Sequence, residues 1–439
     1  MITKTKLWLG ITAASIGLAA SAGAWADSSS KSANGVRFHG GDEIILQGFH
    51  WNVVRTAENN WYNILNGMAQ TIKDDGFTSI WMPVPWRDSS SYDAGSGVTM
   101  GGEGYFWTDF NKNGRYGNNS QLGTTAATLK NKGVKVIYDI VPNHHNRGHW
   151  FDELDLPSNQ GKYRTDCNGC DDGDPFMSGD SDFNTGNYDI YNLFKDELKN
   201  LKDNYSAGGF RFDFVRGYAP ARIDAWMNDS FNSGYCVGEL WKGPNEYPSW
   251  DWRHHASWQE IIKDFSDGSK CSVFDFALKE RMQNGDIKSW QYGLNGNPSS
   301  SWREVAVTFV DNHDTGYSPG PLGGQHHWPL PDHKRKMAYA YILMSPGTPV
   351  VYWPHMYDWG LGGFIRHLIG IRKSAGIKAY SGVNFHNQFS GLVGVTSGTS
   401  KRVVFALDSN FGHPGQVVSG NFDLVENSNG GQIRVWRER

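Results

Sequence analysis

The chain has 439 residues and a formal net charge of −4, and no cluster of basic residues stands out, which argues against a nucleic-acid partner. Its length is enough for one large domain and a smaller one. Aromatic residues make up 14% of the sequence, including 19 Trp. Besides filling a core, such side chains suit stacking on the apolar faces of sugar rings.

The N-terminus has the pattern of a secretory signal peptide. A basic start at 1–6 precedes an apolar run at 7–20 and the sequence Ala24-Trp25-Ala26, which is a small-x-small cleavage site. A transmembrane anchor is the alternative, but the run is too short and too rich in small residues. We expect residues 1–26 to be removed and the protein to be secreted, with no membrane-spanning segment elsewhere.

The next part of the chain alternates between strand-like and helix-like segments. Apolar runs predict β-strands at 44–51, 79–85, 134–141, 210–215, 235–241, 273–277, 305–310 and 349–353. Between most of them lie helix-like stretches at 60–74, 121–132, 188–205, 220–228, 279–292 and 334–344. This alternation indicates a parallel sheet, and eight strands can close a barrel. We therefore predict an α/β fold with a (β/α)₈ TIM barrel over residues 27–375.

Two segments depart from this alternation. The connection after the third predicted strand, residues 142–187, is long, rich in Gly and Asp, and holds two Cys residues. A connection of this length is usually functional or a small domain of its own, so we predict an inserted loop domain. After about residue 375, short alternating runs separated by Gly, Ser and Asn predict a C-terminal antiparallel β-domain over 376–439.

The four Cys residues favour disulfide bonds over a zinc site, because their number is even and a secreted protein meets an oxidising compartment. We expect the pairs Cys167–Cys170 and Cys236–Cys271, with other pairings open. A redox-active Cys167–Cys170 pair is a further alternative, but the Asp-rich loop around it is unlike a thioredoxin site.

Polar side chains gather at the predicted carboxyl ends of several strands, where barrel enzymes carry their chemistry. In the stretch 209–217, Phe residues alternate with the charged residues Arg211 and Asp213. A neighbouring guanidinium holds a carboxylate ionised, which makes Asp213 a candidate nucleophile. Each polar residue alone can be a cap or a structural ion pair, but their shared position points to an active site. The whole set is Asp139, Asn143, His144, Arg211, Asp213, Glu239, His313 and Asp314.

This constellation resembles the alpha-amylase family of glycoside hydrolases, whose four short signatures are matched in order at 139–144, 209–217, 238–241 and 309–314. Longer stretches at 101–107 and 208–220 are similar to the maltotetraose-forming bacterial members. One departure is Arg216-Gly217, where many members have Lys-His, so the substrate contacts of that pair are not carried over. Plant and maltotetraose-forming members also have Gly at the second position.

The resemblance implies that Asp213 is the nucleophile, Glu239 the general acid/base and Asp314 an acid that stabilises the transition state. A retaining glycosidase needs one carboxyl that attacks the anomeric carbon and one that protonates the leaving oxygen. For Tyr105 the alternative is a core aromatic residue, and for His144 and His313 it is a structural histidine. Substrate contacts are implied for Tyr105, His144, Arg211 and His313.

The inserted loop is rich in acids, and clustered carboxylates repel one another unless they are solvated or bind a hard cation such as Ca²⁺. A solvated acidic loop is the alternative. By resemblance, one calcium ion is bound by Asn143, Asp171, Asp174, Asp182 and the Gly217 carbonyl. A second calcium ion near the mature N-terminus would use Asp27, Ser28, His39, Asp42 and Glu43.

The likeness to maltotetraose-forming members also predicts exo-attack, which requires a wall that stops the glucan chain after four sugars. Asp180 is the candidate for this wall, because it is an acid of the loop not needed for calcium and a carboxylate accepts two hydroxyl hydrogen bonds. A turn-capping role is the alternative for Asp180. Trp86 and Tyr92, after the second predicted strand, are candidates for stacking on sugars further from the cut.

We therefore expect a secreted, calcium-dependent and monomeric hydrolase that cleaves α-1,4-glucosidic bonds of starch and maltooligosaccharides with retention. The alternatives are an endo-acting alpha-amylase, an α-glucan transglycosylase on the same scaffold, and a non-catalytic carbohydrate-binding protein. The presence of all three acids argues against the last of these.

Overall fold

The computed structural model of the protein describes residues 35–37, 41–90, 101–146, 161–167, 170, 173–176 and 181–439. The expected signal peptide lies outside these ranges. So do the predicted site residues Asp27, Ser28, His39, Tyr92, Asp171 and Asp180. Across the described residues, no helix combines the length and the apolar character that crossing a bilayer requires.

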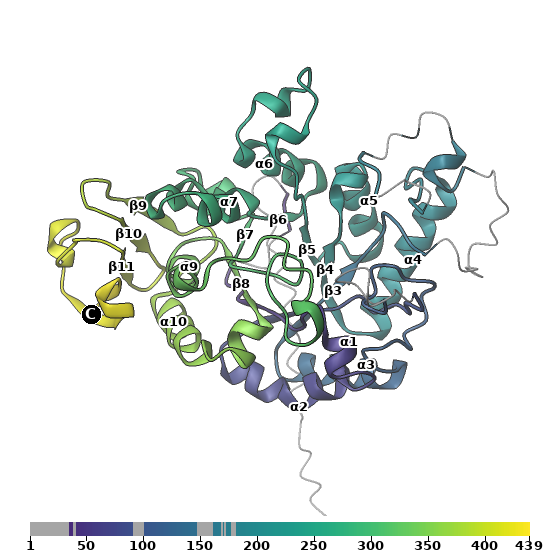
Figure 1. Cartoon of the computed structure of the whole chain (residues 1–439), viewed down its shortest axis with the longest axis horizontal. Coiled ribbons are helices and arrows are strands. Elements are labelled where there is room, and N and C mark those ends of the chain that lie inside the picture. Colours follow the sequence, from purple (N-terminus) through teal and green to yellow (C-terminus); the bar gives the residue numbers. More distant parts are fainter. Residues whose placement is uncertain are drawn as a thin grey trace, which may run out of the picture.

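A closed barrel of eight parallel strands forms the centre of the molecule (Figure 1). Neighbours in the chain are neighbours in the barrel, and β1 pairs with β8 to close it. Almost every strand residue is buried, as expected of parallel strands covered on both faces. The predicted TIM barrel is confirmed. The strands are β1 (Ile45–Gln47), β2 (Ser79–Met82), β3 (Lys135–Ile140), β4 (Ala207–Phe212), β5 (Tyr235–Gly238), β6 (Ser272–Phe274), β7 (Ala306–Phe309) and β8 (Thr348–Tyr352).

Helices cover the outside of the barrel (Figure 1). Side-chain caps start several of them: Asn118 and Gln121 form a capping box at α3, and Ser257 and Glu260 form one at α6. The helices are α1 (Val53–Thr56), α2 (Trp61–Asp74), α3 (Asn119–Asn131), α4 (Tyr188–Asn204), α5 (Pro220–Phe231), α6 (Trp258–Ser269), α7 (Phe276–Asn284), α8 (Ser300–Arg303), α9 (Asp332–Met344) and α10 (Gly362–Ala375).

The sixth strand and the helix after it differ from the prediction. We predicted a strand at 273–277, but β6 ends at Phe274 because Asp275 caps α7 by accepting a 2.9 Å hydrogen bond from the Leu278 N–H. The predicted helix 279–292 therefore starts earlier, at Phe276, and ends at Asn284. A 3₁₀ helix, Ile287–Tyr292, follows it.

The described part of the long connection after β3 is bonded to the end of that strand. The Phe183 N–H donates to the Asn143 carbonyl at 2.8 Å, and the His145 N–H donates to the Ser181 carbonyl at 3.3 Å. These bonds hold this part of the insert at the carboxyl end of the barrel.

Both predicted disulfide bonds are present. Cys167–Cys170 lies within the insert, with the two Cα atoms 6.0 Å apart. Cys236–Cys271 joins β5 to the residue that precedes β6, with the Cα atoms 5.0 Å apart. The second bond therefore links two adjacent barrel strands.

The predicted C-terminal antiparallel sheet is also confirmed. Its order is β12-β13-β11-β10-β9. The two faces of β11 pack differently: Val403 and Phe405 join the core shared with the barrel, whereas Val404 packs with Trp436 in a smaller cluster. The strands are β9 (Gly382–Phe385), β10 (Leu392–Ser397), β11 (Arg402–Leu407), β12 (Phe422–Ser428) and β13 (Ile433–Glu438).

Candidate active site

The carboxyl ends of β3, β4 and β5 bring three acids around one buried guanidinium. Arg211 Nη1 lies 2.8 Å from Asp139 Oδ1 and 2.6 Å from Asp213 Oδ1. Arg211 Nη2 lies 2.7 Å from Glu239 Oε1, close enough for an ion pair, although the angles are not those of a hydrogen bond. Asp213 and Glu239 are each 7% exposed. The two predicted reacting carboxyls therefore share one cation and still reach the surface of the barrel.

The backbone holds these two carboxyls in place. The Asp213 N–H donates to Ile140 O at 2.8 Å and the Glu239 N–H to Phe212 O at 3.0 Å, so the ladder continues one residue past each strand. Phe214 has φ 44° and ψ 45°, a left-handed conformation that is rare for an aromatic residue. Its N–H donates to Glu239 Oε2 at 3.4 Å. This strained residue thus couples the loop after Asp213 to Glu239, as is typical of functional sites.

Burial and repulsion between acids keep a proton on Glu239. Burial raises the pKa of the Glu239 carboxyl well above its usual range, and Asp213, Asp314 and Asp139 raise it further while Arg211 opposes them. Burial also raises the pKa of Asp314 to about 7 and that of Asp139 to about 6. A general acid must be protonated before the reaction, so the environment of Glu239 suits that role.

A chain of hydrogen bonds runs from Gln47 to Asp139. Gln47 Nε2 lies 2.9 Å from His313 Nδ1, and His313 Nε2 lies 2.5 Å from Tyr105 Oη. The Tyr105 hydroxyl in turn donates to Asp139 Oδ2 at 2.8 Å. Because an amide nitrogen only donates, His313 accepts at Nδ1 and donates from Nε2. Burial holds the pKa of His313 well below its usual range, so the ring is neutral.

A hollow of about 540 Å³, which we call the cleft, lies beside the three predicted catalytic acids, and all three line it. Its wall combines aromatic rings with polar groups. Further lining residues include Trp51, Tyr105, His144, Phe176, Trp241 and His327. A concave site with a few convergent titratable groups is the usual form of an active site, and this one has the aromatic surface that a sugar chain needs.

Two predicted substrate contacts, Tyr105 and His144, lie in the cleft wall. Tyr105 stacks on Trp51 with ring centroids 5.5 Å apart, and His144 stacks on Phe176 at 3.8 Å. His144 Nε2 is buried and has no hydrogen-bond partner within the described part of the chain. Burial lowers the pKa of His144 to about 4, so its neutral ring is available to a sugar hydroxyl. His313 is different, because it is fully buried and both ring nitrogens have protein partners.

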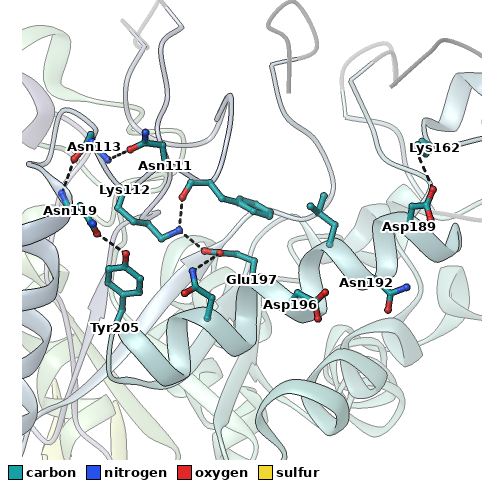
Figure 2. A pocket seen from close by; sticks show the side chains of 13 residues that line it. Asn111, Lys112, Asn113, Asn119, Lys162, Asp189, Asn192, Asp196, Glu197 and Tyr205 are labelled. Carbon is teal, nitrogen blue, oxygen red and sulfur yellow. Dashed lines mark hydrogen bonds and ion pairs between the residues drawn. The ribbon is translucent and has the colours of Figure 1, made fainter. Parts of the chain in front are cut away.

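A larger hollow of about 900 Å³ lies elsewhere, along α4 (Figure 2). Its polar groups bond to one another: the Tyr205 hydroxyl donates to Asn119 Oδ1 at 2.6 Å, and Lys112 Nζ donates to Glu197 Oε1 at 2.7 Å. None of the three predicted catalytic acids lines this hollow. The cluster of acids, rather than the size of a hollow, therefore identifies the active site.

Trp86 does not line the cleft. Its side chain is 2% exposed, its indole N–H donates to Glu197 Oε1 at 2.9 Å, and its ring packs against Trp107 and Phe110. A ring enclosed in this way cannot stack on a sugar, so the prediction that Trp86 contacts substrate is wrong.

Two of the predicted calcium ligands, Asn143 and Gly217, lie against each other. A Cβ added to Gly217 would come within 2.0 Å of Asn143 Oδ1, so only glycine permits this approach. Asp182, a third predicted ligand, is fully buried and forms a β-bridge with His144, the neighbour of Asn143. Amide, carbonyl and carboxylate oxygens of this kind suit a hard cation. These three residues therefore fit a calcium site.

Asp174 is placed differently from the other predicted ligands. Its carboxylate lies 2.7 Å from Arg216 Nε and 2.6 Å from Lys242 Nζ. In this arrangement two side-chain cations neutralise Asp174, which departs from its predicted role as a metal ligand. Within the described ranges, no group of three or more His, Cys, Asp or Glu side chains is placed to hold a metal ion.

Asp42 and Glu43, predicted for a second calcium ion, have protein partners. Asp42 Oδ2 lies 3.4 Å from Lys378 Nζ. Glu43 is 2% exposed and its Oε1 lies 2.9 Å from Lys135 Nζ. Since the other predicted ligands fall outside the described residues, the second calcium site stays a prediction.

Several cleft residues were not predicted. Trp51 and Trp241 follow barrel strands closely, so an aromatic residue just past a strand end is a signal that the sequence did offer. Phe176 comes from the insert, and Gln325 and His327 come from the long connection after β7. Nothing in the local sequence of these three marks them as cleft residues.

Comparisons with known proteins agree with this fold. A family model described as "Alpha amylase, catalytic domain" matches residues 60–166, and one described as "Glucan 1,4-alpha-maltotetraohydrolase, domain C" matches residues 357–420. Probable alpha-amylase 2 from Arabidopsis thaliana is 32% identical over 81% of this chain and 86% of that protein. A solved alpha-amylase from Geobacillus thermoleovorans has a TM-score of 0.67 at 15% identity, covering 91% of this chain and 98% of that one.

The chain belongs to the alpha-amylase family of glycoside hydrolases. Within the family it is similar to two proteins named glucan 1,4-alpha-maltotetraohydrolase. The one from Roseateles saccharophilus is 64% identical over 94% of this chain and 76% of that protein. The one from Stutzerimonas stutzeri is 63% identical over the same shares.

Proposed function

We propose that this enzyme hydrolyses α-1,4-glucosidic bonds of starch and maltooligosaccharides and releases mainly maltotetraose from non-reducing ends. The observation that carries the reaction type is the pair of carboxyls at Arg211: Asp213 is in contact with its guanidinium, and Glu239 has a raised pKa. The specificity is supported by the similarity to the two maltotetraohydrolases, which extends over 94% of the chain.

The first step makes and breaks one bond at the anomeric carbon. Asp213 attacks that carbon, and the bond to the leaving oxygen breaks as Glu239 gives this oxygen its proton. The products of this step are a glycosyl ester on Asp213 and a shortened glucan. Arg211 places a fixed positive charge beside Asp213. The pKa of Arg211 lies above the ordinary range, because the carboxylates around it outweigh burial.

The second step releases the sugar. A water molecule gives a proton to the Glu239 carboxylate and attacks the anomeric carbon, which displaces Asp213. Two inversions at one carbon give net retention. Asp314 lines the same cleft, and its Oδ2 lies 3.2 Å from His313 Nε2, which places the third acid beside the two reacting carboxyls.

We also propose that a calcium ion fixes the insert to the barrel. Asn143, Asp182 and the Gly217 carbonyl would hold it, together with Asp171, which lies outside the described residues. The support is the close approach of Asn143 to Gly217 and the burial of Asp182 beside the end of β3. When bound, the ion would supply a positive charge that neutralises these oxygens.

Secretion and a monomeric state complete the proposal. The two disulfide bonds fit a protein that folds in an oxidising compartment. Secretion also agrees with the signal-peptide pattern at 1–26.

The function is tested by the products of early digests of soluble starch, resolved by chromatography. Maltotetraose as the main early product supports exo-attack, and retention is read from the anomer that appears first by NMR. A mixed ladder would favour an endo-acting alpha-amylase, and products longer than a maltooligosaccharide substrate would favour a transglycosylase. A transglycosylase among the relatives is a cyclomaltodextrin glucanotransferase from Bacillus sp. (strain 6.6.3), which is 26% identical over 67% of this chain and 43% of that protein.

A further inference from the structure

The segment between β5 and α6 carries two exposed indole rings. It includes two 3₁₀ helices, η4 (Pro244–Glu246) and η5 (Trp252–His255), and projects beyond the barrel near α6 (Figure 1). Trp250 is 84% exposed and Trp252 is 52% exposed. Leaving an indole in water forgoes the free energy of burial, about 25 cal/mol per Å² of apolar surface. Such exposure is therefore typical of a ring that binds a ligand.

The segment on either side of Trp250 is internally braced. Two cations contact the Tyr247 ring, with Lys242 Nζ 4.2 Å and the Arg253 guanidinium 4.4 Å from its centroid. Arg253 also forms a double contact with Asp251, at 2.9 Å and 2.5 Å. A rigid platform loses little conformational entropy when a ligand stacks on it.

Trp250 lines a hollow of about 420 Å³ that we call the side hollow. The side hollow is bounded by this segment, by Gly173 and Asp174 of the insert, and by the start of α5. Arg216 lines both the side hollow and the cleft, and it is held between them by contacts to Asp174 at 2.7 Å and Glu246 at 2.9 Å. The side hollow thus shares a wall with the cleft.

The charges that line the side hollow balance. Three are acidic and three are basic, which leaves no net charge to attract nucleic acid, an anion or a metal ion. These groups still offer donors and acceptors for hydroxyl groups. A neutral, hydroxyl-rich ligand with a flat apolar face matches them best. The six residues are Asp174, Asp251 and Asp264, and Arg216, Lys242 and Arg253.

We propose that the side hollow is a second binding position for an α-glucan chain, with Trp250 as its stacking platform. This inference rests on the proposed function. In the proposed reaction Glu239 protonates the oxygen of the departing glucan. The polypeptide segment that follows Glu239 leads from that point to Trp250. The side hollow would therefore hold the part of a long glucan that lies beyond the cut. Binding in the side hollow would increase the affinity for long glucans but not for short oligosaccharides.

The test compares long and short ligands in the Trp250→Ala variant. In a Glu239→Gln background, which prevents hydrolysis, we expect Trp250→Ala to weaken the binding of long amylose about 10-fold, a loss of about 1.4 kcal/mol, with maltotetraose unaffected in calorimetry. With Glu239 intact, kcat/KM on soluble starch should fall while kcat/KM on maltopentaose is maintained. Tyr188→Ala is the matched control, because Tyr188 is also an exposed ring, at 78%, but does not line the side hollow.

Three results would overturn the proposal. Unchanged amylose binding would show that the side hollow holds no glucan. An equal loss for amylose and maltotetraose would place Trp250 in the cleft instead. A concentration-dependent dimer that Trp250→Ala abolishes, with amylose binding intact, would make a second copy of the chain the occupant. None of these touches the proposed function, which fails separately if the unmodified enzyme does not hydrolyse starch.

Discussion

Arg211 and Asp213 lie two residues apart on one strand end, and their side chains are in contact at 2.6 Å between Nη1 and Oδ1. Successive side chains alternate across a strand, so a spacing of two puts both on the same side, inside the barrel. The contact is therefore a direct consequence of the local sequence. It places a fixed positive charge beside the carboxyl that we propose as the nucleophile.

The first prediction concerns the two reacting carboxyls. Asp213→Asn and Glu239→Gln should each lower kcat on maltooligosaccharides by about 10²-fold or more, because each removes a covalent or proton-transfer step. The melting temperature should stay near that of the unmodified enzyme. Asp196→Asn, on the exposed face of α4, is the control. A Glu239→Gln enzyme with a tenth of the original kcat would disprove the assignment.

The second prediction concerns pH. Because the pKa of Glu239 is raised, its protonated form persists to higher pH than in an ordinary carboxyl, and kcat should fall as pH rises through that pKa. A maltosyl fluoride needs no proton on its leaving group. On this substrate the alkaline fall should disappear and Glu239→Gln should regain much of the glycosylation rate. An alkaline fall of equal size on both substrates would assign the titration to another group.

The third prediction concerns the effect of the buried Asp314 carboxyl on the stability of the fold. Its pKa is raised by burial to about 7, above the value in the unfolded chain, so the folded state binds the extra proton between about pH 4 and pH 7. Stability from this group is therefore present at low pH and lost as pH rises through 7. Asp314→Asn should raise the melting temperature at pH 8 by about a degree or more and change it little at pH 4. In a protein of this length, a change of 1 kcal/mol in the free energy of unfolding shifts the melting temperature by about 1 °C. A larger rise at pH 4 than at pH 8 would contradict this.

The fourth prediction concerns calcium. An ion bound only by the folded protein stabilises it, so excess chelator should lower the melting temperature and activity together, and added Ca²⁺ should restore both. Asp182→Ala should lower the melting temperature and remove most of its dependence on calcium. Asp189→Ala, an exposed acid at the start of α4, should keep that dependence. A melting temperature that chelator leaves unchanged in the unmodified enzyme would rule out the calcium site.

The sequence predicted the barrel and the acids because both depend on local pattern. The buried strands are continuous apolar runs, and Asp213 and Glu239 each follow their strand directly. The predicted sixth strand was too long because residues 273–277 are apolar except Asp275, and an acid in such a run can equally cap a helix. Only the tertiary structure decides between these outcomes.

Distant partners explain two single residues that lie differently from the prediction. Trp86 is enclosed by Glu197, which is far away in the chain, and no local pattern separates a core indole from one that faces a sugar. Asp174 was expected to bind calcium because it lies among acids, but Lys242 and Arg216 come to it from other strand ends. Such pairings follow from the packing of the barrel loops and cannot be read from the sequence of the insert.

The last prediction concerns the length of the product. The insert reaches the cleft, since Phe176 lines it and stacks on His144 at 3.8 Å, so other insert residues are candidates for the wall that ends the glucan chain. Asp180→Ala should remove hydroxyl contacts at this wall and shift the early products of soluble starch from mainly maltotetraose to mixed lengths, with kcat changed by less than about 10-fold, as for the loss of about one hydrogen bond. Phe176→Ala should act in the same direction, and Asp189→Ala should not. If Asp180→Ala still released mainly maltotetraose, the chain would be stopped by a different residue.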